Sequence, residues 1–401
     1  MPPPLHLALP SRLLPISVAL LIAALLVGGT LALSAGDAAS RALGLSLALG
    51  AVFGVILQRG RFCFVCNTRD LIDQRDPRGV LAILLALAVG VAGYTLVVGA
   101  WLPVPQPERL PPDAHIGPVS WVLALAAFAF GLGMAISGSC ISAHLYRLGE
   151  GSPTSPFALL GTWLGFGLGF LTWNTLYLAV IAEAPVIWLP HHLGYAGTLA
   201  ASLAGLALLA AAALAWAGGR ATHDAAATGS TSLARAILVA RWPAAVTGLA
   251  IGALSAASYL RVGPLGVTAE IGSLARSAAS GWNILPDTLH GLDGFRGCAT
   301  VLKETLLSEN GLFVTGLVGA SLASALLAGQ FAPRRPTVRD VLAGLSGGVL
   351  MGWGAMTALG CTVGVLLSGI HAGALSGWVF LVASFFGLLA GLPLRRRWVP
   401  V

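Results

Sequence analysis

The amino-acid sequence predicts an all-α polytopic membrane protein, built as an inverted-repeat bundle of about 9–10 transmembrane helices with short re-entrant helices. Composition is the first reason. Of 401 residues, 57% are hydrophobic and only 9% are charged, whereas an average soluble domain has about 25% charged residues. The second reason is that apolar runs long enough to cross a hydrocarbon core of about 30 Å recur along the chain. The third is a duplicated glycine–cysteine motif.

The composition also excludes several classes of protein. A net charge of +7 in so apolar a chain reports membrane topology and not an affinity for nucleic acid. The 52 glycines predict a tight bundle, because small residues let membrane helices approach closely. Five cysteines lie at apolar helix ends, so we expect a free thiol and no secreted disulfide framework. Neither a P-loop nor paired haem histidines occur, and we expect no cofactor and no metal.

Ten apolar segments are long enough to span a membrane. They are residues 13–35, 42–58, 79–101, 119–137, 157–181, 195–217, 236–259, 311–331, 340–360 and 375–394. The lipid bilayer is therefore an expected partner of the chain. Four more segments are too apolar for ordinary loops and too short to cross. They are residues 62–72, 140–148, 263–279 and 297–307. We expect them to re-enter or line the bundle, because irregular backbone at membrane depth needs support from protein.

Basic residues predict the orientation. Arginines follow the second, sixth, eighth and tenth segments, which places all four clusters on the cytoplasmic side of the inner or plasma membrane, with both termini cytoplasmic. Residues 261–303 would lie outside with four basic residues, and we expect re-entrant burial to compensate for them. The predicted parts are a first half with an extra N-terminal helix (1–217), a polar cytoplasmic linker (218–235) and a second half (236–401).

Two copies of one motif indicate the internal repeat. The first is Gly-Leu-Gly at residues 131–133, followed after six residues by Cys140. The second is Gly-Trp-Gly at residues 352–354, followed after six residues by Cys361. The copies end the fourth and ninth segments, an odd number of spans apart, so they point in opposite directions. Inverted repeats place substrate sites near the midplane of the membrane.

Cys140 and Cys361 are the first candidates for a functional site. A free cysteine is often a small apolar core residue, so packing is the alternative for either one, but the duplicated context favours function. Both follow a glycine-lined helix end, where exposed backbone N–H groups and the start of a short helix suit an anion. A thiol offers such an anion a weak, polarisable donor.

Cys63 and Cys66 form a C-x-x-C motif that has three interpretations. As a redox pair, they would depend on the nearby arginines to activate a thiol. A zinc site would need two more ligands, and none has suitable spacing. In the third interpretation Cys63 lines a path and Cys66 packs beside it. Cys298 follows a glycine, as Cys361 does, and is a candidate for path lining or for packing.

Charged residues in apolar surroundings are candidates for a gate. Arg147 and Glu150 follow the Cys140 segment and are three residues apart, so they are placed either to pair on one helix face or to form a cytoplasmic exit or docking point. Lys303 has the same two interpretations, and intramembrane ionisable residues favour function. Arg61 precedes Cys63 at the same predicted exit.

Several motifs, in order, resemble the YeeE/YedE family of sulfur-compound transport proteins. The matching stretches are Gln58-Arg-Gly-Arg-Phe-Cys63, Ser137-Gly-Ser-Cys140, Tyr146-Arg-Leu-Gly-Glu-Gly151, Leu359-Gly-Cys361-Thr-Val-Gly364 and Leu375-Ser-Gly-Trp378. The resemblance covers most of the chain. It implies an hourglass-shaped inverted-repeat bundle with one full span fewer than the ten counted above.

The resemblance also implies a cargo and a path. Thiosulfate, or a related sulfur anion, would be imported past Cys361, Cys140 and Cys63 through S–H hydrogen bonds. It would leave near Arg147 and Arg61. A small cytosolic sulfur-carrier protein is the implied partner, and the family is one of transporters and not of enzymes.

Two features depart from the family pattern and leave alternatives open. Cys66 and Cys298 are not part of it. A membrane thiol–disulfide oxidoreductase that uses Cys63 and Cys66 is therefore the alternative function. Some relatives are associated with selenium, so a selenium compound is the alternative cargo.

Overall fold

The computed structural model describes residues 10–106, 109–218, 233–286, 288–292, 300–303 and 307–398, and its regular elements there are helices. The long helices are α1 (Pro10–Ser34), α2 (Ala38–Gly60), α4 (Arg78–Trp101), α5 (Trp121–Ser137), α7 (Ser155–Leu176), α8 (Leu189–Ala217), α10 (Ala244–Arg261), α12 (Glu309–Leu327), α13 (Val338–Thr357) and α15 (Leu375–Trp398). The short ones are α3 (Phe64–Gln74), η1 (Tyr177–Ile181), α6 (Ile141–Gly149), α9 (Leu233–Leu238), α11 (Thr268–Gly281), η3 (Thr362–Ser368) and α14 (Gly369–His371).

The long helices confirm the predicted membrane protein. Within the described ranges, nine helices are long and apolar enough to cross a membrane, and ten if α13 and its bent continuation form one span. One predicted boundary is wrong. The segment predicted at 236–259 begins at Ala244, and α9 is a separate helix before it. Pro243 precedes α10, and proline disfavours the helical conformation for the residue before it.

Three of the four predicted short segments are helices. Residues 62–72, 140–148 and 263–279 correspond to α3, α6 and α11. The fourth, residues 297–307, lies mostly outside the described residues. The division into two halves stays a prediction, since most of the linker is also outside them.

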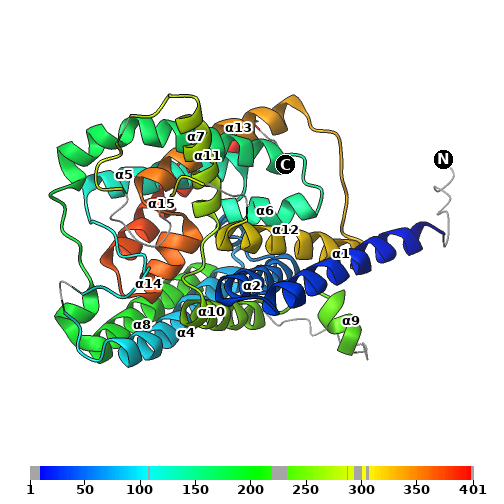
Figure 1. The fold of residues 1–401 in the computed structure, drawn as a ribbon, viewed down its shortest axis with the longest axis horizontal. Coiled ribbons are helices and arrows are strands. Elements are labelled where there is room, and N and C mark those ends of the chain that lie inside the picture. Colours follow the sequence, from blue (N-terminus) through cyan, green and yellow to red (C-terminus); the bar gives the residue numbers. More distant parts are fainter. Residues whose placement is uncertain are drawn as a thin grey trace.

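The long helices pack into two bundles that lie side by side (Figure 1). In one bundle α2 packs on α12 and α10 packs on α4, with α1 and α8 at its edges. In the other, α5 packs on α15 and α13 packs on both α7 and α5. Each bundle therefore combines helices from both halves of the chain. The contact between α2 and α12 is equivalent to the contact between α10 and α4. The contact between α5 and α15 is likewise equivalent to the contact between α13 and α7. Such matched contacts, in which each helix packs on a helix of the other half, are expected of an inverted repeat.

Glycines of the duplicated motif allow these helices to approach closely. A β-carbon added to Gly131 would lie 2.0 Å from the carbonyl oxygen of Ser384. One added to Gly352 would lie 2.1 Å from the carbonyl oxygen of Thr162. Side chains cannot occupy either position, so the first role of the repeated glycines is helix packing.

The short helices connect the two bundles. α6 contacts α2 and α12 in one bundle and α7 in the other, while α14 contacts α4 and α15. α11 contacts α7, α12 and α13. Three short elements begin directly after a cysteine, which is the N-cap residue: Cys63 for α3, Cys140 for α6 and Cys361 for η3. The repeat therefore brings its cysteines to the seam between the bundles.

The stretch that conflicts with the predicted orientation has a buried part, residues 265–273, which includes the start of α11. Arg276 of α11 is buried and donates a hydrogen bond to the carbonyl oxygen of Thr300. Lys303 is buried against Glu270. Two of the four basic residues are thus compensated by protein groups, as expected for a re-entrant segment.

Candidate functional site

Cys140 lies at the junction between α5 and α6. α5 ends because Gly138 adopts the left-handed conformation (φ 89), which glycine reaches without strain. The Cys140 thiol is 3% exposed, and its sulfur is 3.3 Å from the hydroxyl of Ser142. The backbone N–H of Ala143 also interacts with it. The thiol therefore has polar neighbours, which simple apolar packing would not provide.

The thiol of Cys63 lies beside that of Cys140. α2 ends at Arg61, which adopts the left-handed conformation (φ 48), and Cys63 begins α3 two residues later. The Cys63 side chain is 1% exposed and interacts with the thiols of both Cys140 and Cys66. The fold thus brings Cys140 beside Cys63 and Cys66, which belong to a different segment of the sequence.

Cys361 reaches the seam from the opposite direction. α13 ends near Leu359, which adopts the left-handed conformation (φ 60). The Cys361 thiol is buried and interacts with the side chain of Thr268 and with backbone N–H groups of η3. The next residue, Thr362, interacts through its side chain with the Cys140 thiol. The first turn of η3 therefore connects the two motif cysteines.

Arg147 and Glu150 do not form the pair that their spacing predicts. Arg147 donates from Nη2 to the Cys66 sulfur at 3.0 Å. Glu150 accepts a hydrogen bond of 3.1 Å from the side-chain amide of Gln58. The pairing prediction is wrong because Glu150 is the residue that caps the end of α6, so the helical spacing does not extend to it.

Arginines surround Cys66. Arg69, Arg147 and Arg395 all lie within electrostatic range of its thiol. Arg69 also forms a surface ion pair with Asp70, with an N···O distance of 3.1 Å. From the sequence Arg395 is only a topology signal. Its place in this cluster depends on the packing of α15 against α5, which no local motif encodes.

Lys303 lies near the other end of the cysteine series. Its ammonium group pairs with Glu270 of α11, two residues after Thr268 in the first turn of that helix, and the two side chains are 6% and 10% exposed. Ser308 accepts a bond of 3.1 Å from Lys303 and donates one of 2.9 Å to Glu270. The charge of Lys303 is therefore cancelled locally by a buried partner.

Two further candidates from the sequence, Arg61 and Cys298, are not among the interacting thiols described above. Arg61 is exposed and lines a surface cavity of about 240 Å³ together with Asn67 and Trp242. It is therefore outside the group of contacting thiols. Cys298 lies outside the described residues, so its predicted role stays a prediction.

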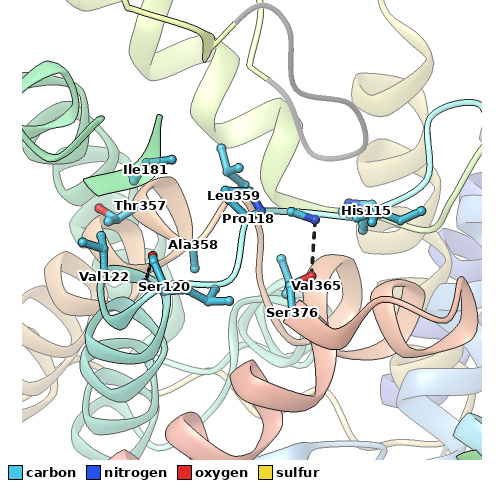
Figure 2. Close-up of a pocket in the computed structure, with 13 residues that line it drawn as sticks. His115, Pro118, Ser120, Val122, Ile181, Thr357, Ala358, Leu359, Val365 and Ser376 are labelled. Atoms are coloured by element: carbon cyan, nitrogen blue, oxygen red, sulfur yellow. Dashed lines mark hydrogen bonds between the residues drawn. The ribbon is translucent and has the colours of Figure 1, made fainter. Parts of the chain in front are cut away.

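A pocket beside the break between α13 and η3 is absent from the sequence predictions (Figure 2). It is lined by the loop that carries His115 and by Thr357 and Val365. His115 is 4% exposed, and within the described residues neither of its ring nitrogens has a hydrogen-bond partner. Burial lowers the pKa of His115 to about 4, so the ring is neutral near pH 7. A lone histidine in a proline-rich loop carries no signal in the sequence.

Similarity to known proteins identifies the family. The family model described as sulphur transport matches residues 59–390. The chain belongs to the sulphur transport family. One curated relative, the thiosulfate transporter TsuA of Spirochaeta thermophila, is 29% identical over 336 residues, which are 79% of this chain and 88% of that protein. The thiosulfate transporter TsuA of Escherichia coli is 26% identical over 337 residues, 79% of this chain and 84% of the relative.

Another member of the sulphur transport family matches a shorter region. The probable transporter YedE of Salmonella typhimurium is 32% identical over 132 residues, 33% of this chain and 30% of that protein. These similarities confirm the resemblance to YeeE/YedE proteins and the transport of sulfur compounds through a membrane. The family match includes all the cysteines that meet at the seam.

Proposed function

We propose that this protein imports thiosulfate, or a closely related sulfur anion, along Cys361, Cys140 and Cys63. The observation that carries the proposal is the interaction between the buried thiols of Cys140 and Cys63 at the seam between the bundles. Thr362 supports it, because it extends this contact to the neighbourhood of Cys361. The two relatives named as thiosulfate transporters support the choice of cargo.

Thiols suit this cargo for a physical reason. An S–H group is a weak, polarisable donor, and the terminal sulfur of thiosulfate is a soft acceptor that sulfate lacks. Backbone N–H groups at the start of α6 add fixed partial positive charge next to Cys140. Several weak sites in series permit passage, since each must release the ion as readily as it binds it.

The arginines around Cys66 support an exit at that end. Arg147 would receive the anion after Cys63, and Arg69 and Arg395 would add to the attraction. This end is cytoplasmic in our proposal, with the protein in the inner membrane and both termini cytoplasmic. Exposed basic residues there, such as Arg61, are our proposed contact for a small sulfur-carrier protein.

The remaining candidates would act as gates. Glu150 joins the end of α6 to α2 through Gln58, so it is placed to hold the exit closed. Lys303, with its partner Glu270, is our candidate for the outer entrance, where Cys298 is also proposed.

Uptake of sulfur-labelled thiosulfate tests the proposal. Cells that lack their own thiosulfate importers would express the wild type, Cys140→Ala, Cys361→Ala or the control Cys66→Ala at equal levels in the membrane. We expect both path substitutions to abolish uptake and the control to retain most of it. Cys140→Ser should be impaired, because oxygen is less polarisable than sulfur.

Two other results would contradict parts of the proposal. Uptake at the wild-type level by Cys140→Ser would contradict the thiol path. No uptake by the wild type would move the cargo to another sulfur compound or to a selenium compound.

The interaction between Cys63 and Cys66 favours a second candidate, a membrane thiol–disulfide oxidoreductase. A C-x-x-C pair at the start of a helix is typical of such enzymes. The control substitution separates the two functions, because Cys66→Ala would destroy the enzyme and spare the transporter. The duplicated Cys140 and Cys361 sites favour transport, since an enzyme gains little from a pseudosymmetric path.

A further inference from the structure

We infer that Cys63 and Cys66 are a modification site, a reversible disulfide that closes the substrate path; this inference rests on the proposed transport function. Cys63 is the N-cap residue of α3, and Cys66 is the third residue of the helix. Cys63 thus has two thiol neighbours, Cys140 on the path and Cys66 beside it. Cys66 has no role in the transport proposal itself.

The first turn of α3 places the two thiols at a suitable separation. The turn is closed by a hydrogen bond of 3.0 Å from the Asn67 N–H to the Cys63 carbonyl oxygen. Side chains three residues apart on a helix have β-carbons about 5–6 Å apart, and a disulfide requires about 3.5–4.5 Å. The Cys63 and Cys66 thiols are free and already interact. Side-chain rotation with a small backbone adjustment is then sufficient to join them.

Cys66 is the thiol that reacts first. It is partly exposed, whereas Cys63 is almost completely buried. The guanidinium of Arg147 lies 3.0 Å from the Cys66 sulfur and is a counter-charge for the thiolate that attacks a small disulfide. Accessibility, and not thiol acidity, makes Cys66 the first of the two to react. Exchange therefore begins at the arginine-rich end of the path.

The oxidant in this proposal is a small-molecule disulfide. The Cys66 thiolate attacks one of its sulfurs, which forms a mixed disulfide and releases one small thiolate. Cys63 gives its proton to that thiolate and attacks the Cys66 sulfur. The second small thiolate then leaves and takes up from water the proton that Cys66 had lost on ionising. In sum, two protein thiols are oxidised to one disulfide while the small disulfide is reduced to two thiols, and small thiols reverse the reaction.

Oxidation interrupts the path at one step. The disulfide removes the S–H donor of Cys63, which is the neighbour of Cys140, and leaves Cys140 and Cys361 unchanged. The anion then has no thiol between Cys140 and the arginines. Import would continue while the cytosolic small thiols are reduced and stop when they become oxidised.

Peptide mass spectrometry and uptake, measured on the same proteoliposomes, test this inference. Purified full-length protein would be equilibrated with glutathione disulfide or with dithiothreitol, then alkylated and digested with trypsin. We expect oxidation to leave the peptide of residues 62–69 two hydrogens lighter and without alkyl groups. Thiosulfate uptake should fall several-fold and return with dithiothreitol. Cys66→Ser should keep its uptake in both conditions, because it retains the S–H donor of Cys63 and cannot form the disulfide.

Three results would overturn the inference. One is a 62–69 peptide that takes up two alkyl groups after oxidation. Another is a disulfide between Cys63 and Cys140 in its place. The third is inhibition of Cys66→Ser as strong as that of the wild type. A disulfide at residues 62–69 in a protein that shows no thiosulfate uptake when reduced would support the modification site and overturn the proposed cargo.

Discussion

The two helix breaks that carry Cys140 and Cys361 share a backbone design but have different surroundings. In each, a long helix ends near a left-handed residue, Gly138 or Leu359, two positions before the cysteine. The cysteine then begins a short element. Beyond Cys140 lie another thiol and a group of arginines, whereas beyond Cys361 lie a threonine and a buried ion pair without net charge.

A second pair of equivalent positions shows the same contrast. Cys66 of α3 and Glu270 of α11 each lie three residues after the N-cap of their helix. Cys66 accepts a hydrogen bond from Arg147, and Glu270 pairs with Lys303. A thiol leaves the charge of Arg147 available to an anion, whereas a carboxylate cancels the charge of Lys303. The repeat therefore preserves helix packing while the side chains make one end of the proposed path cationic and the other neutral.

The largest effect should come from removing the carboxylate of this buried pair. Glu270→Gln leaves the Lys303 ammonium buried without a counter-charge, and we expect a loss of about 3–5 kcal/mol of stability. Thermal unfolding in detergent measures it. The double variant Glu270→Gln/Lys303→Met should recover most of the loss. If Glu270→Gln lowers the stability of the protein no more than Cys66→Ala does, the contrast between the Cys140 end and the Cys361 end is not electrostatic.

The next largest effect should come from replacing the glycines that occupy matching positions in the two motifs. It tests whether the two halves share the same close helix packing. Gly131→Ala and Gly352→Ala should each destabilise the protein by about 1–3 kcal/mol, because the added methyl group meets a backbone carbonyl. Gly167→Ala is the control, since no atom lies within 4 Å of its added β-carbon. Unfolding curves that separate the two motif variants widely would contradict equivalent packing.

Arg147 tests the cationic end. Arg147→Ala should reduce thiosulfate uptake about tenfold, which corresponds to about 1.4 kcal/mol, because the anion loses its charged receiver after Cys63. Arg147→Lys should retain part of the activity. Arg334→Ala is the control, since Arg334 is 56% exposed and lies outside this cluster. Equal uptake by Arg147→Ala and Arg334→Ala would exclude the proposed exit.

The smallest effect concerns His115 at the neutral end. Its folded-state pKa is about 4, below the ordinary value of 6.5, so the unfolded chain binds more protons between these values. This contribution to stability is present above pH 6.5 and is lost as the pH falls towards 4. At about pH 5.5 the loss should be about 1 kcal/mol. His115→Gln should unfold with a correspondingly weaker dependence on pH, and an unchanged dependence would show that the ring is solvated.

Much of the architecture could be predicted from local sequence. Apolar runs predicted all ten long helices, and only the start of α10 was wrong, where Pro243 is the N-cap residue. The repeated glycines and cysteines predicted equivalent halves. These features depend on helix length and on small residues at helix contacts, which adjacent residues encode.

The contacts of the candidate site were less accessible to sequence reasoning. The spacing of Arg147 and Glu150 predicted a pair, but the first turns to Cys66 and the second to Gln58. Arg395 and His115 had no motif to distinguish them. Each of these side chains meets partners from helices that are distant in the sequence.

The sequence by itself determined a membrane protein with a duplicated unit, a thiol at the same place in each copy, and the membership of the sulphur transport family that these motifs share. Only the tertiary structure decided that the thiols of Cys63 and Cys140 interact and that Lys303 has Glu270 as a counter-charge. The physical reason is that hydrophobicity and helix ends are local properties. Thiol contacts and charge compensation arise only when two interleaved bundles bring the short helices together.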